Sequence, residues 1–231
     1  MPSSVRIELQ GEAVELHGDR ALYWPRLQRL LIADLHLGKA DVFRRAGIGL
    51  PRGGTEHDLL RLSSLIDTTR AQSLCILGDV LHGAAPEAAW RAKWESWRAR
   101  HRDVHMSALS GNHDRALGKA GLDIELLGPA IDEAAFALRH EPQAHGSLHV
   151  ICGHLHPVIG IRGIRRRFPC FWMRHGMTVL PAFSQFTGGF LLLPSPNDCV
   201  VACVDDDAVL VRSSEGRMAA TAEKRNARPD N

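Results

Sequence analysis

The sequence lacks the features that mark secreted, membrane-bound or strongly charged proteins. Its five cysteines form no CxxC pair, and their odd number argues against a disulfide framework or a structural zinc site. We therefore expect them to be small apolar core residues in a reducing compartment. No apolar stretch approaches the length of a membrane span, and the first residues lack the charged start and apolar run of a signal peptide. These absences predict a cytoplasmic protein.

The overall charge is also small. The formal net charge is +2 over 231 residues, so bulk charge does not indicate a nucleic-acid-binding protein. Hydrophobic residues make up 45% and charged residues 23%, as in an ordinary soluble protein with a buried core. We expect a single domain over residues 1–212. The polar segment 213–231 has no apolar periodicity, and we expect it to be a disordered tail.

Histidine, by contrast, is abundant. The chain contains thirteen histidines, and histidine is the commonest metal ligand in proteins. Several of them stand beside Asp or Asn in short segments bounded by glycine. Others, such as His17 and His101, are expected to be scattered surface residues.

Short apolar runs that end in polar clusters recur along the chain. Such runs are consistent with buried strands, which we expect at residues 30–33, 73–77, 104–109, 135–139 and 148–152. Helices are expected from an N-cap at Thr55 and over residues 86–100, and the region from 178 to 211 is strand-like. Because ligands bind at the carboxyl ends of strands in layered α/β sheets, the polar clusters should converge on one site.

These clusters contain a set of metal-ligating side chains. Its members are Asp34, His36, Asp79, Asn112, His140, His154 and His156. In the Asp-x-His and His-x-His pairs, alternate residues of an extended strand end would point the same way. Mixed oxygen and nitrogen ligands without thiolate suit Mn²⁺, Fe or Zn. Seven side chains exceed the need of one ion and indicate two ions that share a carboxylate.

His140 is assigned to this set because it ends a predicted strand, and two nearby histidines compete with it. His149 lies within an apolar run, where a core position is the better interpretation. His145 lies in a predicted loop, where exposure to solvent is expected.

Each short motif is weak alone, and their order along the chain makes them specific. The set Asp34-x-His36, Gly78-Asp79, Gly111-Asn112-His113-Asp114, His140 and Gly153-His154-x-His156 resembles the calcineurin-like binuclear metallophosphoesterases, over residues from about 30 to 190. The resemblance implies an α/β fold, a two-sheet sandwich flanked by helices with the metals at the carboxyl ends of strands. It also implies that Asp34, His36 and His156 hold one metal, that Asn112, His140 and His154 hold the other, and that Asp79 bridges them.

A proton donor is expected beside these ligands. Two metals can activate water and neutralise charge during displacement at phosphorus, after which the leaving oxygen needs a proton. His113 is placed to supply that proton. Asp114 would orient His113 and favour its protonated form. The pair resembles the general-acid dyad of the superfamily.

Two regions bear on the substrate. Residues 162–174, RGIRRRFPCFWMR, interleave arginines with aromatics, which suits a single-stranded nucleic acid but also a basic loop over a core cluster. Candidate phosphate contacts are Lys39, Arg45 and Arg52, in the loop after the first motif, and Arg166 and Arg167. The stripe Trp90, Trp94 and Trp97 could stack bases, although its helical spacing favours a core face.

Longer segments resemble a narrower group. DLHLGKADVFRRAGIGLPRGG, RRRFPCFW and LPAFSQFTGG are similar to the bacterial DNA-ligase-associated, PdeM-type metallophosphoesterases, although Ser184 stands where glycine is expected. This resemblance implies a Mn²⁺-dependent endonuclease for single-stranded DNA, associated with a DNA-repair set of ligase, helicase and exonuclease. A small-molecule or nucleotide phosphodiesterase or phosphatase on the same site is the alternative, and a scaffold that has lost its metals is a further one.

Overall fold

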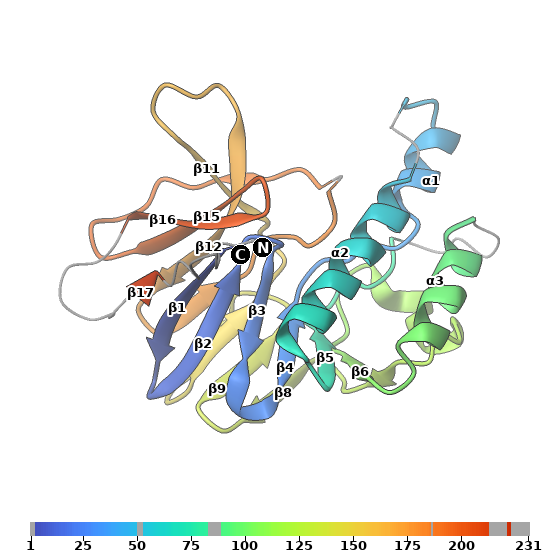
Figure 1. Cartoon of the computed structure of the whole chain (residues 1–231), viewed down its shortest axis with the longest axis horizontal. Helices are drawn as coiled ribbons and strands as arrows, with labels where there is room; N and C mark the ends of the chain where they lie inside the picture. Colours follow the sequence, from blue (N-terminus) through green and yellow to red (C-terminus); the bar gives the residue numbers. More distant parts are fainter. Residues whose placement is uncertain (1–2, 50–52, 83–88, 186, 213–220, 223–231) are drawn as a thin grey trace, which may run out of the picture.

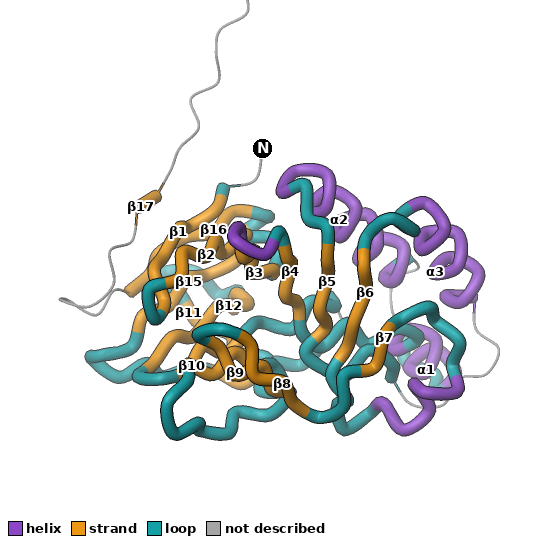
Figure 2. The backbone as a smooth tube through the Cα atoms, turned by 90° about the horizontal axis from the view of Figure 1, so that it is seen from below, coloured by secondary structure: helices purple, strands orange, loops and turns teal. Residues whose placement is uncertain are grey.

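Two stacked β-sheets form the body of the protein, and helices cover the outer face of one of them (Figures 1 and 2). The computed structural model describes residues 3–49, 53–82, 89–185, 187–212 and 221–222. The first sheet has the strand order β17 (Thr221–Ala222), β1 (Ser4–Leu9), β2 (Glu12–His17), β3 (Ala21–Trp24), β4 (Arg29–Ile32), β5 (Ser73–Ile76), β6 (His105–Ala108) and β7 (Glu125–Leu126).

The second sheet holds the later strands. Its order is β14 (Phe190–Leu191), β11 (Pro157–Gly160), β12 (Arg167–Arg174), β13 (Met177–Val179), β10 (His149–Cys152), β9 (Phe136–Arg139) and β8 (Ala130–Glu133). β15 (Cys199–Val204) pairs with β12 and with β16 (Asp207–Arg212). The helices are α1 (Lys39–Arg45), α2 (Gly54–Thr69) and α3 (Ala89–Arg100), with short 3₁₀ turns at Pro25–Leu27 and Asp114–Lys119. The predicted two-sheet α/β sandwich is confirmed.

Strands in the middle of each sheet run parallel, which places several carboxyl ends at one edge. β4, β5 and β6 are parallel neighbours in the first sheet, and β9, β10 and β13 in the second. β4 is apolar on both faces, as expected for a covered parallel sheet. Leu30 and Ile32 pack in the core under the helices, whereas Leu31 and Ala33 pack in the core between the sheets.

The helix layer explains the tryptophan stripe. Trp90, Trp94 and Trp97 are buried against α2 and the first sheet, so the core interpretation is confirmed. The indole N–H of Trp94 forms a hydrogen bond in this core, since it donates to the Leu122 carbonyl at 3.0 Å. The expected N-cap at Thr55 is wrong, because Gly53 caps α2 in a left-handed conformation. Helix α1 was not predicted, and residues 86–88 lie outside the described part of the chain.

Two other expectations need correction. Thr221 and Ala222 pair with β1, within the segment predicted to be a disordered tail, and the remainder of 213–231 lies outside the described residues. His17 is buried, 3.7 Å from the carboxylate of Glu15, and is not a surface residue. No helix in the described residues is long and apolar enough to cross a membrane.

The five cysteines are buried and free, as expected. Burial raises the pKa of Cys203 and Cys152 to about 12 and that of Cys75 and Cys199 to about 11. Because the thiolate is the reactive form, iodoacetamide should modify the native protein far more slowly than the protein unfolded in guanidinium. Rapid labelling of any one cysteine under native conditions would contradict this packing, and mass spectrometry identifies the site.

Candidate metal centre

Five loops that follow parallel strands bring the predicted metal ligands to one edge of the sandwich. Asp34 and His36 follow β4, Asp79 follows β5, and Asn112 follows β6 in the first sheet. His140 follows β9 and the His154–His156 pair follows β10 in the second sheet. The predicted position of the set at the carboxyl ends of strands is therefore observed, with both sheets contributing.

The backbone at these positions is left-handed, not extended. The φ angles are 57° at Asp34, 49° at His36, 53° at Asp79, 69° at His154 and 51° at His156. Non-glycine residues seldom adopt this region, and each instance costs of order 1–3 kcal/mol unless the surroundings impose it. The expectation that alternation along an extended strand end aligns these pairs is therefore wrong. The left-handed conformation at each of these residues directs its side chain into the site.

Backbone hydrogen bonds between neighbouring loops hold this conformation. The N–H of Asp34 donates to the Gly78 carbonyl at 3.2 Å, and the N–H of His36 donates to the Asp79 carbonyl at 2.9 Å. The Asp34 carboxylate also accepts the His154 N–H at 3.0 Å, which joins the two sheets. The loops thus fix one another, and no single loop forms the site.

Glycines make room for the ligands. A Cβ on Gly153 would lie 2.7 Å from Asp34 Oδ2 and 2.4 Å from Ala33 Cβ. A Cβ on Gly111 would lie 2.3 Å from Asp79 Oδ1. Both contacts are impossible for a real side chain, so glycine at these positions lets backbone approach the carboxylates directly.

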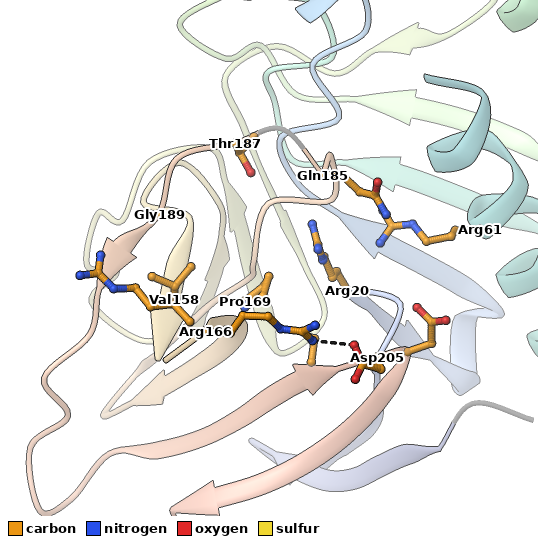
Figure 3. Close-up of a pocket in the computed structure, with 13 residues that line it drawn as sticks. Arg20, Arg61, Val158, Arg166, Pro169, Gln185, Thr187, Gly189 and Asp205 are labelled. Atoms are coloured by element: carbon orange, nitrogen blue, oxygen red, sulfur yellow. Dashed lines mark hydrogen bonds and ion pairs between the residues drawn. The ribbon is translucent and has the colours of Figure 1, made fainter. Parts of the chain in front are cut away.

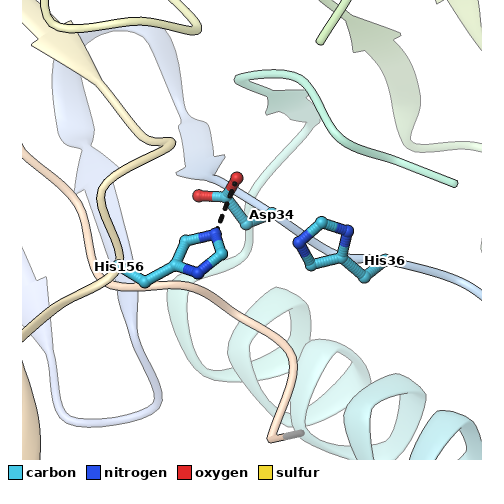
Figure 4. Close-up of side chains that lie close together, drawn as sticks. All are labelled: Asp34, His36 and His156. Carbon is cyan, nitrogen blue, oxygen red and sulfur yellow. Dashed lines mark ion pairs between the residues drawn. The ribbon is translucent and has the colours of Figure 1, made fainter. Parts of the chain in front are cut away.

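The donor atoms form two overlapping groups. One group holds Asp34, His36 and His156, and the other holds Asp34, Asp79 and His140, with all ligand atoms of a group within 4.8 Å of one another. Figure 4 shows the imidazoles of His36 and His156 on either side of the Asp34 carboxylate, with His156 Nε2 at 3.2 Å from Asp34 Oδ1. His140 Nε2 lies 3.6 Å from Asp79 Oδ1 and 3.2 Å from His154 Nδ1.

Carbonyl groups set the tautomers of two of these histidines. His140 Nδ1 lies 2.9 Å from the Leu77 carbonyl, and His156 Nδ1 lies 3.2 Å from the Gly188 carbonyl. A carbonyl only accepts, so the proton sits on Nδ1 in each ring and the Nε2 lone pair faces the carboxylates. This partner on the far nitrogen is the usual arrangement around metal-binding histidines.

Unpaired buried atoms indicate that the site is built for cations. Asp34 Oδ1, His156 Nε2 and both ring nitrogens of His36 are buried and form no hydrogen bond among the described residues, although Asp34 Oδ1 and His156 Nε2 lie 3.2 Å apart. Burial, followed by the charge of Lys39, lowers the pKa of His36 to about 2, so its imidazole is neutral and free to donate a lone pair. Orphaned polar atoms of this kind are rare in folded proteins. Divalent metals fit these donors.

Comparisons with known proteins agree with this geometry. The model of the calcineurin-like phosphoesterases matches residues 28–180. The chain belongs to the calcineurin-like phosphoesterase family. The crystal structure of Pseudomonas putida nuclease MPE shares 41% sequence identity with this chain and has a TM-score of 0.76, covering 86% of this chain and 96% of that chain.

More distant structures are also similar. YfcE, a phosphoesterase from E. coli, is 19% identical with a TM-score of 0.42, covering 84% of this chain and 98% of that chain. An uncharacterized protein from Streptococcus pneumoniae TIGR4, a predicted phosphoesterase, is 14% identical with a TM-score of 0.31, covering 84% and 97%. No curated protein matches. The match to the family model and the cluster of metal-ligating side chains identify the chain as a metal-dependent phosphoesterase, and the family uses divalent metals.

In this phosphoesterase the remaining motif residues stand at the mouth of the site. Asn112 and His113 are exposed, and the His113 N–H donates to Asp79 Oδ1 at 2.9 Å. The His113 ring stacks on His82 with centroids 5.1 Å apart and lies 5.6 Å from the His36 ring. His82 was missed at the sequence level, although it stands three residues after Asp79 in the same glycine-bounded segment.

Asp114 does not orient His113 as expected. Its carboxylate accepts backbone N–H groups, from Gly111 and Leu81 at 2.9 Å each and from Val80 at 3.3 Å. Burial raises the pKa of Asp114, and these three donors oppose that shift. Asp114 therefore ties the loop after β6 to the loop after β5. No contact between its carboxylate and the His113 ring occurs within the described residues.

The predicted substrate residues differ in their surroundings. Lys39 is buried, and burial lowers its pKa while Asp34 and Asp79 oppose the shift, so it lies beside the metal centre. Arg45 is exposed at the end of α1. Arg166 and Arg167 are exposed, and Arg166 pairs with Asp205 at 2.6 Å. Arg52 lies outside the described residues.

The aromatic half of the arginine-rich segment is part of the core. On β12, Phe168 and Phe171 are buried, and Trp172 is partly buried with its indole N–H donating to Asp198 at 3.0 Å. Of the two interpretations of this segment, the core aromatic cluster is therefore the one observed, and the alternation reflects a strand with a core face. Arg167 is exposed, forms no ion pair among the described residues and remains available to a substrate.

Gly153→Ala should weaken metal binding, because the new methyl group displaces Asp34. We expect the Kd for Mn²⁺ to rise roughly 10–100-fold, the range seen when groups that support metal ligands are lost. Isothermal titration calorimetry measures this. Gly160→Ala is the matched control, since a Cβ there meets nothing within 4 Å. Equal affinities in both variants would contradict the close approach.

Asp114→Ala should act on stability. Two buried backbone donors and one partly buried donor lose their acceptor, and the free energy of unfolding should fall by roughly 1–3 kcal/mol. Denaturant unfolding measures the change, and Asp114→Asn, which keeps one acceptor oxygen, should lose less. A variant of unchanged stability but greatly reduced turnover would instead support a role in proton transfer.

Proposed function

We propose that this phosphoesterase is a DNA endonuclease that cleaves single-stranded DNA with two divalent metal ions, for which Mn²⁺ is the preferred candidate. The cluster of buried, unpartnered carboxylate and imidazole atoms supports the metal-dependent chemistry. The similarity to a protein described as a nuclease supports the choice of nucleic acid. A role in DNA repair, in the cytoplasm and beside a ligase, a helicase and an exonuclease, belongs to the same proposal.

Each ligand has a proposed role. Asp34, His36 and His156 would hold one ion, Asn112, His140 and His154 the other, and Asp79 would bridge them. The first group and the Asp79–His140 contact match the observed proximities. Asp34 also belongs to both observed groups, which makes it a second candidate for the bridging carboxylate. Fe and Zn suit the same donors.

The chain's own residues would handle charge and protons. Bound divalent ions supply a nucleophile from water at neutral pH and offset charge on the phosphoryl oxygens. Lys39, buried beside Asp34 and Asp79, adds a fixed positive charge at the same place. As the bond between phosphorus and the leaving oxygen breaks, the exposed ring of His113 gives that oxygen a proton.

The position of the site suits a polymer. Asn112 and His113 are exposed, and His154 and His156 are partly exposed, so a strand can reach the centre from outside. Helix α1, which begins at Lys39 beside Asp34 and Asp79, carries the exposed Arg45 at its other end. A small-molecule phosphodiesterase would need no such cation.

The substrate is tested with labelled single- and double-stranded DNA and Mn²⁺, beside bis(p-nitrophenyl) phosphate. We expect internal cleavage of the single strand, and loss of cleavage and of bound metal in Asp79→Ala. If the wild-type protein hydrolyses the small diester but leaves DNA intact, the nuclease proposal fails and the phosphoesterase activity stands.

His113→Ala should retain its metals and lose turnover mainly for poor leaving groups. A general acid contributes roughly 10²–10⁴-fold, so DNA cleavage should fall by that order, whereas p-nitrophenolate leaves without a proton. Metal content by plasma mass spectrometry is the control. Loss of metal in this variant would assign His113 a ligand role instead.

A further inference from the structure

A cavity lined by arginines lies on the far side of the loop that supports the metal ligand candidate His156. The cavity measures about 480 Å³, and its lining includes Arg20, Arg61, Arg166 and Arg167 (Figure 3). Gln185, Thr187 and Gly189 form another part of the wall. The neighbouring Gly188 carbonyl is the partner of His156 Nδ1, so one short loop borders both the cavity and the metal centre.

Arg20 and Arg61 both donate hydrogen bonds to the backbone just before this loop. Arg20 Nη1 donates to the carbonyls of Ala182 and Phe183 at 3.4 Å and of Ser184 at 3.0 Å, and Arg61 Nη2 also donates to the Phe183 carbonyl. In Figure 3 the two guanidinium groups approach each other beside Gln185. Like charges placed together repel each other, and a bound anion between them would relieve the repulsion.

The counter-charges in the lining do not match the cations. Four arginines line the cavity against two aspartates, Asp205 and Asp206, and Asp205 pairs with the exposed Arg166. A further buried acid, Asp19, lies outside the lining and interacts with the charges of Arg20 and Arg61. Asp58 pairs with Arg61 at 3.1 Å, but burial raises the pKa of Asp58 to about 6. Burial, followed by the charge of Arg61, lowers the pKa of Arg20 to about 10, and the charges of Asp58 and Asp206 oppose this shift.

Several guanidinium donors remain unused. Within the described residues, the hydrogen bonds of the Arg20 side chain come from Nη1 and go to carbonyls. Arg61 is 9% exposed, and its Nε has no partner among the described residues. Arg167 is exposed at the rim, with no ion pair in the described part of the chain. Planar guanidinium groups match the oxygens of a phosphate.

We propose that this cavity is a second phosphate-binding site, in which Arg20, Arg61 and Arg167 hold a phosphate of the nucleic-acid strand that flanks the bond cleaved at the metal centre. The choice of a nucleic-acid phosphate as the ligand depends on the proposed function. The capacity to bind an anion depends only on the arginines of the cavity. The strand would run from the metal centre past Gly188 and anchor in the cavity. Such an anchor selects a polymer over a small diester.

Tungstate tests the anion site without any assumption about DNA. Crystals of the Mn²⁺-loaded protein are soaked in tungstate, an analogue of phosphate with a strong anomalous signal. We expect a peak between Arg20 and Arg61 in addition to any peak at the metal centre. A filled metal centre with an empty arginine cavity would overturn the proposal.

Substrate selectivity tests the link to the strand. For each variant, kcat/KM for a long unstructured oligonucleotide is divided by kcat/KM for bis(p-nitrophenyl) phosphate. Arg167→Ala should lower this ratio about tenfold and reduce the salt slope of binding by about 1, as expected for one lost phosphate contact. Arg165→Ala, an exposed neighbour outside the cavity lining, should change the ratio less than about twofold.

The outcomes separate the two proposals. Equal effects of Arg165→Ala and Arg167→Ala would show general attraction by charge and overturn the flanking site. A tungstate peak with no change in selectivity would show an adventitious ion only. If the wild-type protein does not cleave the oligonucleotide at all, the nuclease function fails, and the tungstate experiment alone decides whether the cavity binds anions.

Discussion

The whole site depends on a backbone constraint, since five ligand candidates are held in left-handed turns at the ends of parallel strands. Isolated, such turns would relax, because each L residue there costs of order 1–3 kcal/mol. The loops after β4 and β5 bond to each other through main-chain groups, and Asp34 reaches the His154 N–H across the two sheets. Strain is therefore stored where the chemistry is needed and is balanced by the sandwich that surrounds it.

The same constraint explains the residues that are not ligands. Asp114 ties two loops through three amides, and Gly111 and Gly153 allow those loops to approach the carboxylates. Arg20 and Arg61 hold the Phe183–Ser184 backbone, whose N–H groups in turn donate to the carbonyls of Ala33 and Asp34. The support around the metal centre thus extends to buried charges on α2 and near β3, far from the motif residues in sequence.

The sequence could predict the parts of this arrangement that depend on residue type at a strand end. Asp34, Asp79, His140 and His156 were found because carboxylate and imidazole follow apolar runs, and the sheets bring them within 4.8 Å of one another in two groups. The left-handed turns were not predictable, since the sequence pattern Asp-x-His is compatible with both an extended and a left-handed backbone.

Contacts between distant residues account for the other errors. The role of Asp114 depends on amides of Val80 and Leu81, more than thirty residues away. The sequence left base stacking and a core position open for the aromatics of β12, because β15, the strand that pairs with β12 in the sheet, lies later in the chain. Arg61 and the Phe183 carbonyl that it contacts are 122 residues apart, so the local sequence pattern around either residue cannot predict the contact.

The central claim is that the strained loops form a binuclear metal centre. Crystals grown with Mn²⁺, with diffraction recorded near the manganese absorption edge, test it most directly. The account predicts two anomalous peaks roughly 3.5–4 Å apart, each within bonding distance of Asp34 or Asp79 and of the histidines around them. A single peak, or manganese bound away from these carboxylates, would contradict it.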